Sequence, residues 1–472
     1  MIGRPLKLAA IGGFSLALLG CASVSPEGVV GAVNTTLGTS NPVQAQLLTS
    51  AEAQAGANAK ANALLLNELS QAGAVQLAIL NSPDMQAMLA SGVASAANAA
   101  QGGRIANPTF SFERMHATGE LELARALSFG LLDLLTLPQR QAVAKLNVDK
   151  VQLQLAQQLV RQLSDVKLAW VSAIAANQRL LYAQQVQRSA NASAELAKRL
   201  KAVGNFSWLQ QASQQQFASD AAIQLATAQH TNISATQHLV RLLGLNTSQE
   251  ALMRLPKKLP SIPKQTLSPE DVSAVAMDTR LDVQLAKLDV TRLLGSNTLA
   301  QIDSFTDVEW GIRGVDKKDT ADGSVSQSNG FEVAIRLPIF DWGDNKRVAL
   351  SANSLMAAKN YESTMLNASS ELRVSYSAYR TAYDLAAHYQ NEVIPMRARM
   401  AEENQYSYNG MLISVFELLA DARQQVAAVT QSLNAVEQFW ASEAALQNSL
   451  LGAPSAAVSV SAASAQADSP GH

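Results

Sequence analysis

The only cysteine of this 472-residue sequence, Cys21, stands where its thiol could be acylated. A short basic region with Arg4 and Lys7 comes first, and an apolar stretch ending in Leu-Leu-Gly runs up to the cysteine. This order is typical of an export signal, and a cysteine directly after it is typical of a bacterial lipobox. We therefore predict a signal peptide over residues 1–20 and a mature chain that begins at a diacylglycerol-modified Cys21. Ala22, rather than an Asp, favours the outer membrane; an ordinary signal peptide that contains a cysteine by chance is the alternative.

Other chemistry has little support in the residues. A single cysteine leaves no disulfide within the chain and no multi-thiolate metal site. His230 and His238 are about two helical turns apart, too far to hold one metal ion as a pair, so we expect no metal and no cofactor. No glycine-rich nucleotide motif or nucleophile turn is present, so we expect no enzyme. The formal net charge of −2, without a basic patch, argues against a nucleic-acid partner.

Two carboxylates could act together. Glu417 and Asp421 are four residues apart and share one face if this segment is helical. If several copies of the chain surrounded one axis, the pairs would form a negatively charged constriction that attracts cations, as acidic rings do in cation channels. A solvated helix face is the alternative.

Two short segments combine turn residues with apolar ones. Glycine ends helices and serine begins them, so both segments are expected to be tips of helical hairpins. Their apolar side chains are unusual for a free turn and predict contact with a partner protein, whereas plain turn chemistry is the alternative. The residues of the two tips are Val203, Gly204, Asn205, Phe206 and Ser207, and Asn409, Gly410, Met411, Leu412, Ile413 and Ser414.

The elements that carry these residues occur twice along the chain. Leu242-Leu243-Gly244 recurs at 450–452, and the segment 78–84 (AILNSPD) resembles 276–282 (AMDTRLD). We therefore predict a first repeat over 21–255 and a second over 256–452. Four prolines between Pro256 and Pro269 exclude a helix or a central strand at the join. Residues 453–472 lack a core pattern and are expected to be a disordered tail.

Long helices dominate the pattern. Ala, Gln, Leu and Ser are abundant and aromatic residues make up 5%, which is typical of helices packed through small residues. Between Pro138 and Gly204 no Pro or Gly interrupts the sequence, which predicts a rod of about 100 Å. We expect long helical hairpins over about 138–243 and 341–451. In the second, Pro395 should kink the helix near Val393.

Two further segments, about 107–131 and 307–338, alternate apolar and polar side chains and are expected to be strand pairs. Strands of about nine residues suit a tilted membrane crossing. Arg125 interrupts the apolar side, so we expect its strand to begin near Arg125, at the membrane interface. Four strands cannot close a barrel and an open edge in lipid is forbidden, so spanning strands would require a barrel shared by several subunits. Two soluble hairpins are the alternative.

The chain resembles the TolC-like outer membrane factors over almost its whole mature length. The matching pieces are 77–86 (LAILNSPDMQ), 103–110 (GRIANPTF), 337–343 (LPIFDWG) with Arg347, and 408–422 (YNGMLISVFELLADA); 392–395 (EVIP) is most similar to the heavy-metal efflux branch.

This resemblance implies a mainly α-helical fold with a small β part. Its helical hairpins form a periplasmic α-barrel, and three subunits each give four strands to a transmembrane β-barrel. It also implies a homotrimer in the outer membrane that extends into the periplasm. Such a trimer conducts solutes passively from periplasm to exterior, with a periplasmic adaptor and an inner-membrane transporter, in RND-type efflux or type I secretion. A structural coiled-coil lipoprotein that bridges envelope layers without a channel is the rival interpretation.

Overall fold

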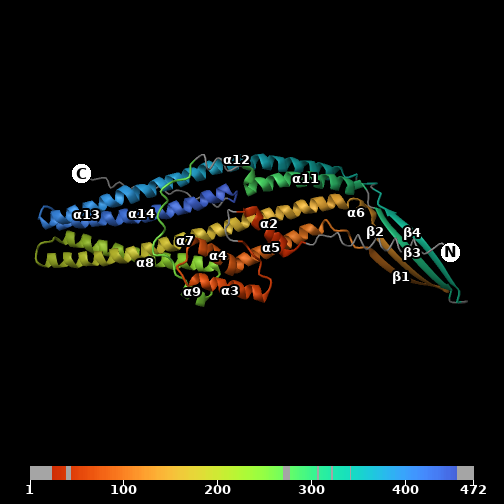
Figure 1. Cartoon of the computed structure of the whole chain (residues 1–472), viewed down its shortest axis with the longest axis horizontal. Helices are drawn as coiled ribbons and strands as arrows, with labels where there is room; N and C mark the ends of the chain where they lie inside the picture. Colours follow the sequence, from red (N-terminus) through yellow and green to blue (C-terminus); the bar gives the residue numbers. More distant parts are fainter. Residues whose placement is uncertain are drawn as a thin grey trace. The chain divides into compact units, whose positions relative to one another are not determined.

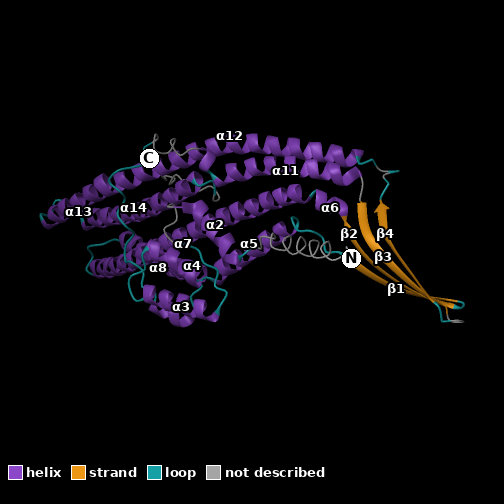
Figure 2. Cartoon of the chain, turned by 45° about the vertical axis from the view of Figure 1, so that its right-hand side comes forward, coloured by secondary structure: helices purple, strands orange, loops and turns teal. Residues whose placement is uncertain are grey.

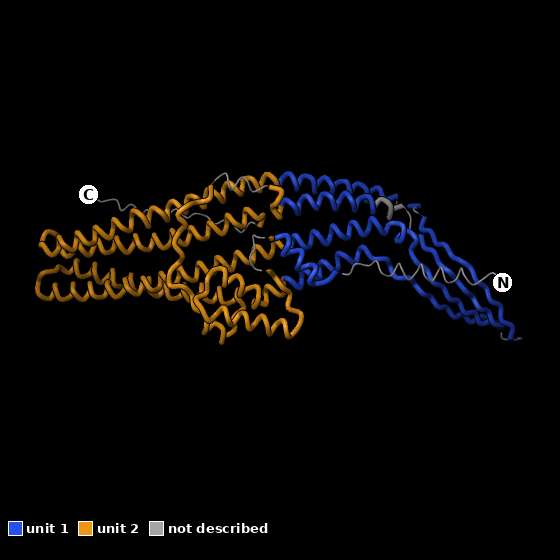
Figure 3. The backbone as a smooth tube through the Cα atoms, viewed as in Figure 1, with its two compact units in different colours: residues 1–37, 89–155, 283–364 blue, residues 38–88, 156–282, 365–472 orange. Residues whose placement is uncertain are grey.

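The computed structural model describes residues 24–38, 44–268, 277–305, 308–319, 323–337, 339–340 and 342–453. Cys21, the signal peptide and all but the first residue of the expected tail lie outside the described residues. The chain divides into two compact units (Figure 3): residues 1–37, 89–155 and 283–364 form unit 1, and residues 38–88, 156–282 and 365–472 form unit 2. Each unit combines segments from both sequence repeats, so the repeats are not separate compact bodies.

Unit 1 contains one antiparallel sheet (Figure 2). Its strands are β1 (Thr109–Ala117), β2 (Glu120–Gly130), β3 (Val308–Asp319) and β4 (Val325–Ile335), paired in the order β1-β2-β3-β4. The two expected strand pairs are joined, because β2 pairs with β3 from Glu120↔Asp319 to Gly130↔Glu309. Strands β1 and β4 each have one partner within the described chain, so both have an open edge.

The expected start of the second strand was wrong. Strand β2 begins at Glu120, five residues before Arg125, and Arg125 lies in its middle. Its guanidinium pairs with Asp316 of β3, with Nη2 and Oδ2 3.0 Å apart. A partner on a strand 191 residues away lets the charged side chain stay within regular pairing, so the arginine does not mark a strand end.

Unit 1 also contains helices, and polar side chains form contacts between some of them. They are α2 (Pro26–Leu37), α6 (Leu131–Leu135) and the unit-1 parts of α5 (Pro83–Gln101), α7 (Leu137–Ala202), α11 (Leu281–Phe305) and α12 (Asp344–His388). Lys150 of α7 forms an ion pair with Asp289 of α11, with Nζ and Oδ1 2.7 Å apart. Asn297 of α11 donates to the Ser354 hydroxyl of α12. The first contact joins helices of the two repeats, and the second joins two helices of the second repeat.

Unit 2 holds two helical hairpins (Figure 1). Helix α7, which runs 66 residues as expected, pairs with α8 (Trp208–Leu243), and α13 (Ile394–Asn409) pairs with α14 (Val415–Leu450). Shorter elements are α3 (Ala51–Leu65), α4 (Gln71–Asn81), α9 (Thr247–Leu252) and η2 (Met277–Thr279). Val186 and Ala190 of α7 pack on Ala218 and Ala221 of α8. Small apolar side chains therefore form the contact between these two helices.

Aromatic side chains fill a second core in unit 2. Phe439 of α14 is fully buried and its ring lies 5.7 Å from that of Tyr379 and 5.8 Å from that of Tyr383, both on α12. Trp170 of α7 is buried and donates from its indole nitrogen to the Leu69 carbonyl at 2.8 Å.

Residues 256–268, the described part of the proline-rich join, contain no helix or strand, as expected.

The helix that carries Pro395 is interrupted at the expected place. A π-helical turn, η3 (Tyr389–Val393), separates α12 from α13, and Pro395 follows in the first turn of α13. Proline lacks an N–H and its ring clashes with the carbonyl four residues earlier in a helix, so the regular hydrogen-bond ladder cannot continue there. The Tyr389 hydroxyl donates to Gln431 Oε1 of α14 at 2.9 Å, which ties the π turn to the neighbouring helix.

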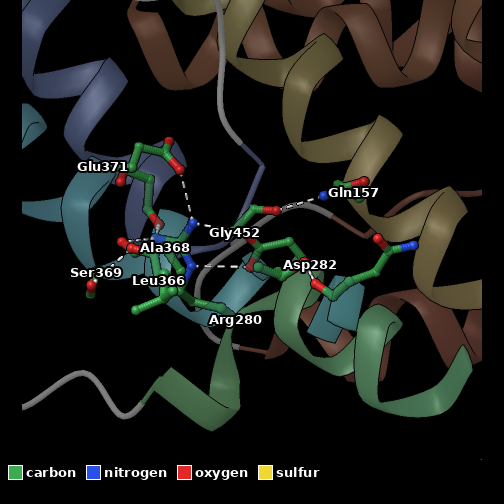
Figure 4. A network of polar contacts seen from close by, with 11 residues as sticks. Gln157, Arg280, Asp282, Leu366, Ala368, Ser369, Glu371 and Gly452 are labelled. Carbon is green, nitrogen blue, oxygen red and sulfur yellow. Dashed lines mark hydrogen bonds and ion pairs between the residues drawn. The ribbon is translucent and has the colours of Figure 1, made fainter. Parts of the chain in front are cut away.

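Arg280 is the centre of a buried polar network in unit 2 (Figure 4). Its side chain is 2% exposed and forms ion pairs with Asp282, at 2.8 Å, and with Glu371 of α12, at 3.1 Å. Its Nη1 donates to the Ser449 carbonyl at 2.5 Å, near the end of α14. Burial alone would lower the pKa of Arg280, but the two carboxylates together raise it above its usual value. The arginine therefore holds three chain segments together as a permanent cation.

The same place in the first repeat has no such charge. Ser82 is equivalent to Arg280 in the repeated motif and is also fully buried. Here Asn81 donates from Nδ2 to the Gly244 carbonyl at 2.8 Å, just after α8. Both repeats thus use this motif to hold the end of the returning helix, with a side-chain amide as the donor in one repeat and a guanidinium in the other.

Candidate functional site

The two hairpin tips have the same backbone conformation and hydrogen-bond pattern. In the first, the Asn205 N–H donates to the Leu200 carbonyl at 2.8 Å, and Gly204 takes a left-handed φ of 82°. In the second, the Leu412 N–H donates to the Ser407 carbonyl at 2.8 Å, and Met411 takes a left-handed φ of 60°. Both are helix ends closed by a left-handed residue. Met411, and not Gly410, is therefore the structural equivalent of Gly204.

Serine begins the returning helix in both tips. The Ser207 hydroxyl accepts from the Gln210 N–H, and the Ser414 hydroxyl accepts from the Glu417 N–H, each completing a capping box. Turn chemistry therefore accounts for Gly204, Ser207 and Ser414, as the alternative interpretation expected. It does not account for the apolar side chains between them.

Those apolar side chains are exposed. Val203 is 70% exposed, Met411 93% and Leu412 80%, whereas Phe206 and Ile413 are half-buried. The Phe206 ring lies 6.4 Å from the Phe416 ring, so the two tips contact each other.

Sequence reasoning missed two members of this surface, Trp208 and Leu209, which are 69% and 71% exposed. The signal was available, because both apolar residues directly follow the serine cap, at positions where a solvated helix would be polar. We call the exposed set the tip surface: Val203, Trp208, Leu209, Met411 and Leu412.

Replacing Met411 with glycine is expected to stabilise the tip. A left-handed conformation costs a non-glycine residue about 1–2 kcal/mol, more than the roughly 0.5–1 kcal/mol of backbone entropy that glycine adds to the unfolded chain. The thermal midpoint of the purified protein should therefore rise slightly. Gly204→Ala is the matched control at the equivalent position and should lower the midpoint. A fall for Met411→Gly would contradict the assigned backbone conformation.

Glu417 and Asp421 both lie in the first two turns of α14, but their carboxylates meet different partners. Glu417 Oε2 accepts from the Ser414 N–H at 2.9 Å as part of the capping box. Asp421 is 11% exposed and its Oδ1 lies 3.8 Å from Arg397 Nη1 of α13. The charge of Asp421 is therefore partly balanced within the chain, and Glu417 is the more open of the two.

The strand register gives the sheet one apolar face and one charged face. The register places Leu127 beside Phe110 and Ile312, and Ile312 beside Phe331. The members of the apolar face are Phe110, Phe112, Leu127, Phe129, Trp310, Ile312, Phe331, Val333 and Ile335. Residues of the charged face include Glu113, Glu122, Glu309, Arg313, Lys317 and Glu332. The alternation expected from the sequence is confirmed.

Ion pairs cross the charged face between strands. Lys317 of β3 lies 3.2 Å from Glu122 of β2, and Arg313 of β3 lies 3.8 Å from Glu113 of β1. Small residues such as Ala124 and Gly311 lie on the same face. This face is suited to contact with water.

Apolar residues continue past the helix-side ends of the strands. Leu135 follows β2 and is 70% exposed, while Ile339 and Trp342 follow β4 and are 66% and 59% exposed. Phe340 is 98% exposed. A cluster of exposed aromatic and aliphatic side chains beside an apolar strand face is typical of a membrane interface.

A half-buried charge pair, Lys167 of α7 and Glu443 of α14, lies in unit 2. Burial lowers the pKa of Lys167 and raises that of Glu443, and each charge opposes the shift of the other. Lys167 Nζ also donates to Gln447 Oε1 at 3.3 Å. Because Lys167 lies on α7 and both Glu443 and Gln447 lie on α14, we interpret the pair as a helix–helix contact.

Within the described ranges, no group of three or more His, Cys, Asp or Glu residues is placed to hold a metal ion. Among the helices that the structure describes, none has both the length and the apolar character needed to cross a membrane.

Three solved structures of membrane proteins share this fold. CusC, studied for its transmembrane channel formation, is 15% identical, with a TM-score of 0.66 over 82% of this chain and 93% of its own. A membrane protein from Pseudomonas aeruginosa is 18% identical, with a TM-score of 0.66 over 87% and 97%. The CmeC outer membrane channel of Campylobacter jejuni is 15% identical, with a TM-score of 0.61 over 89% and 92%. No protein-family model and no curated protein matches the sequence. The expected fold class, mainly helical with long antiparallel hairpins and a small sheet, is confirmed.

Proposed function

We propose that this chain, which has the TolC-like fold, is an outer membrane factor: a subunit of a channel that conducts solutes passively from the periplasm to the exterior. One observation carries this proposal. The single sheet has an apolar and a charged face, and both of its outer strands have open edges. Unpaired backbone groups have no partner in lipid. A sheet of this kind becomes stable in a membrane when copies of the chain close a ring.

Three copies would give twelve strands, with the apolar faces toward lipid and the charged faces toward water. The exposed cluster of Phe340 and Trp342 would then lie at the periplasmic interface. A homotrimer, anchored in addition by a lipid on Cys21, is part of the proposal. The rival interpretation, a coiled-coil lipoprotein without a channel, offers no use for a four-stranded sheet with two unlike faces.

We assign the tip surface to a periplasmic adaptor that links the channel to an inner-membrane transporter of an RND-type or type I secretion system. Apolar residues at the tip of a hairpin are costly unless a partner covers them. The left-handed Met411 supports this role, because backbone strain at a non-glycine residue is often found where a side chain is needed for contact.

The proposal is tested by reconstituting the detergent-purified protein into planar bilayers. Discrete conductance steps and a trimer mass in native mass spectrometry are the expected results. A water-soluble monomer that leaves the bilayer resistance unchanged would contradict it.

We propose Glu417 and Asp421 as a negatively charged constriction at the periplasmic mouth, with Glu417 as the main contributor. Asp421 is balanced by Arg397 and Glu417 is not, so Glu417→Gln should weaken cation selectivity more than Asp421→Asn. The double substitution Glu417→Ala with Asp421→Ala should also weaken block by multivalent cations.

The measurement is the reversal potential of single channels under a salt gradient. Glu52→Gln, an exposed carboxylate at the start of α3, is the matched control and should leave selectivity unchanged. Unchanged selectivity in the double variant would show that the constriction lies elsewhere.

A further inference from the structure

A group of basic residues lies on the apolar face of the sheet, at the end remote from the helices. Arg125 is the next residue on this face of β2 after Leu127, and the register places it between Phe112 and Gly314. Arg114 lies two residues beyond Phe112 on β1, about 7 Å further along the strand. Lys318 occupies the same face near the end of β3. We call Arg114, Arg125 and Lys318 the basic belt.

The belt has little compensation. Asp316 is the only acid on this face of the described strands, and it pairs with Arg125 at 3.0 Å. Arg114 and Lys318 are exposed and form no ion pair with any residue that the structure describes. His116, beside Leu121, adds a weak base to the same end of the face. Beyond Leu127 this face of the described strands therefore carries three cations and one acid, with Leu121 and Leu123 of β2 between them.

A groove joins the two parts. It has a volume of about 420 Å³ and its lining includes Phe110, Leu127 and Ile312 on the apolar side and Arg125 on the basic side. Gly314 leaves the space open, because a Cβ there would lie 3.0 Å from Asn329 Oδ1. An amphiphile fits this arrangement, with its chains on the apolar wall and its headgroup at the arginine.

We propose that the basic belt and this groove bind a phosphorylated lipid of the outer leaflet. Its acyl chains would lie against Phe110, Leu127 and Ile312, and its phosphate groups would accept hydrogen bonds from Arg114, Arg125 and Lys318. The inference rests on the proposed function, since insertion as a channel is what turns the apolar face toward lipid. A phosphate group carries more negative charge and more acceptor oxygens than a carboxylate, which favours a phosphorylated lipid at three basic residues. An acidic peptide would leave the apolar wall uncovered.

The test is native mass spectrometry of the detergent-purified oligomer, titrated with diphosphorylated lipid A and with a phosphate-free analogue that has the same acyl chains. The wild type should bind the phosphorylated lipid roughly 30-fold more tightly, since the two basic residues without an acid partner among the described residues, Arg114 and Lys318, contribute about 1 kcal/mol each near an anionic headgroup. The double variant Arg114→Gln with Lys318→Gln should lose most of this preference, and adding Arg125→Gln should remove the rest.

Lys317→Gln is the matched control. It removes a cation of β3 that is next to Lys318 in sequence but lies on the charged face and outside the groove lining, so it should keep the preference. Equal binding of both lipids by the wild type, or equal loss in test and control variants, would overturn the proposal. Full displacement by inorganic pyrophosphate would show an anion site without lipid recognition and would also overturn it. If the belt variants conduct normally but no longer prefer the phosphorylated lipid, the belt binds the lipid and conduction does not depend on it. A wild type that forms neither oligomer nor channel would instead refute the proposed function.

Discussion

Replacing Arg280 with methionine is expected to destabilise unit 2 by about 3 kcal/mol, because two partly buried carboxylates lose their cation. Asp282 and Glu371 retain 20% and 29% exposure, which keeps the loss near the lower end of the range for a broken buried pair. The Ser449 carbonyl also loses its donor. The thermal midpoint of the purified oligomer, followed by circular dichroism at the helical signal, measures the effect.

Two further variants separate charge from geometry at this site. Arg280→Lys keeps the cation but cannot reach both carboxylates and the carbonyl at once, so an intermediate loss is expected. Arg199→Met removes the exposed i,i+4 pair with Glu195 on α7 and should leave the midpoint unchanged. If Arg280→Met and Arg199→Met behave alike, the buried network contributes nothing to stability.

Replacing Phe331 with arginine is expected to prevent membrane assembly. Phe331 lies on the apolar face of β4, beside Ile312, and is 76% exposed in the single chain. An arginine facing the bilayer midplane costs about 2–4 kcal/mol in each subunit, and a ring of three would carry this cost three times.

The neighbouring residue provides the control. Glu332→Arg introduces the same side chain one position along β4, on the charged face, where water can solvate it. Trimer yield on gels without boiling, after extraction from outer membranes, should fall for Phe331→Arg and stay near the wild type for Glu332→Arg. Equal trimer yields would contradict the prediction, because they would mean that both faces of the sheet have the same surroundings.

Local patterns predicted most of the fold. The absence of Pro and Gly before Gly204 predicted the long helix α7, alternation predicted the two faces of the sheet, and Pro395 predicted the interruption at η3. Each of these depends on residues close together in the sequence. Periodicity and backbone chemistry are sufficient in such cases.

What the sequence could not show depends on distant partners. Arg125 looked like the end of a strand because its ion-pair partner, Asp316, lies on another strand. The repeated segment 276–282 contains Arg280, but its network forms only when α12 and the end of α14 pack around it. The equivalence of Gly204 and Met411 also appears only in the hydrogen bonds of the two tips, because the two residue types differ.

The open edges of β1 and β4 have a genetic consequence. In a closed ring each subunit's β4 must pair with a neighbour's β1, so every subunit depends on both neighbours for its own completeness. A mutant chain that still folds its helices and joins the ring can present a β4 edge that is unable to pair. The β1 strand of the neighbouring wild-type subunit would then have no partner, and the ring would not close. Alleles with lesions on these two strands should therefore be dominant over the wild type when co-expressed, whereas alleles that prevent folding of the whole chain should be recessive.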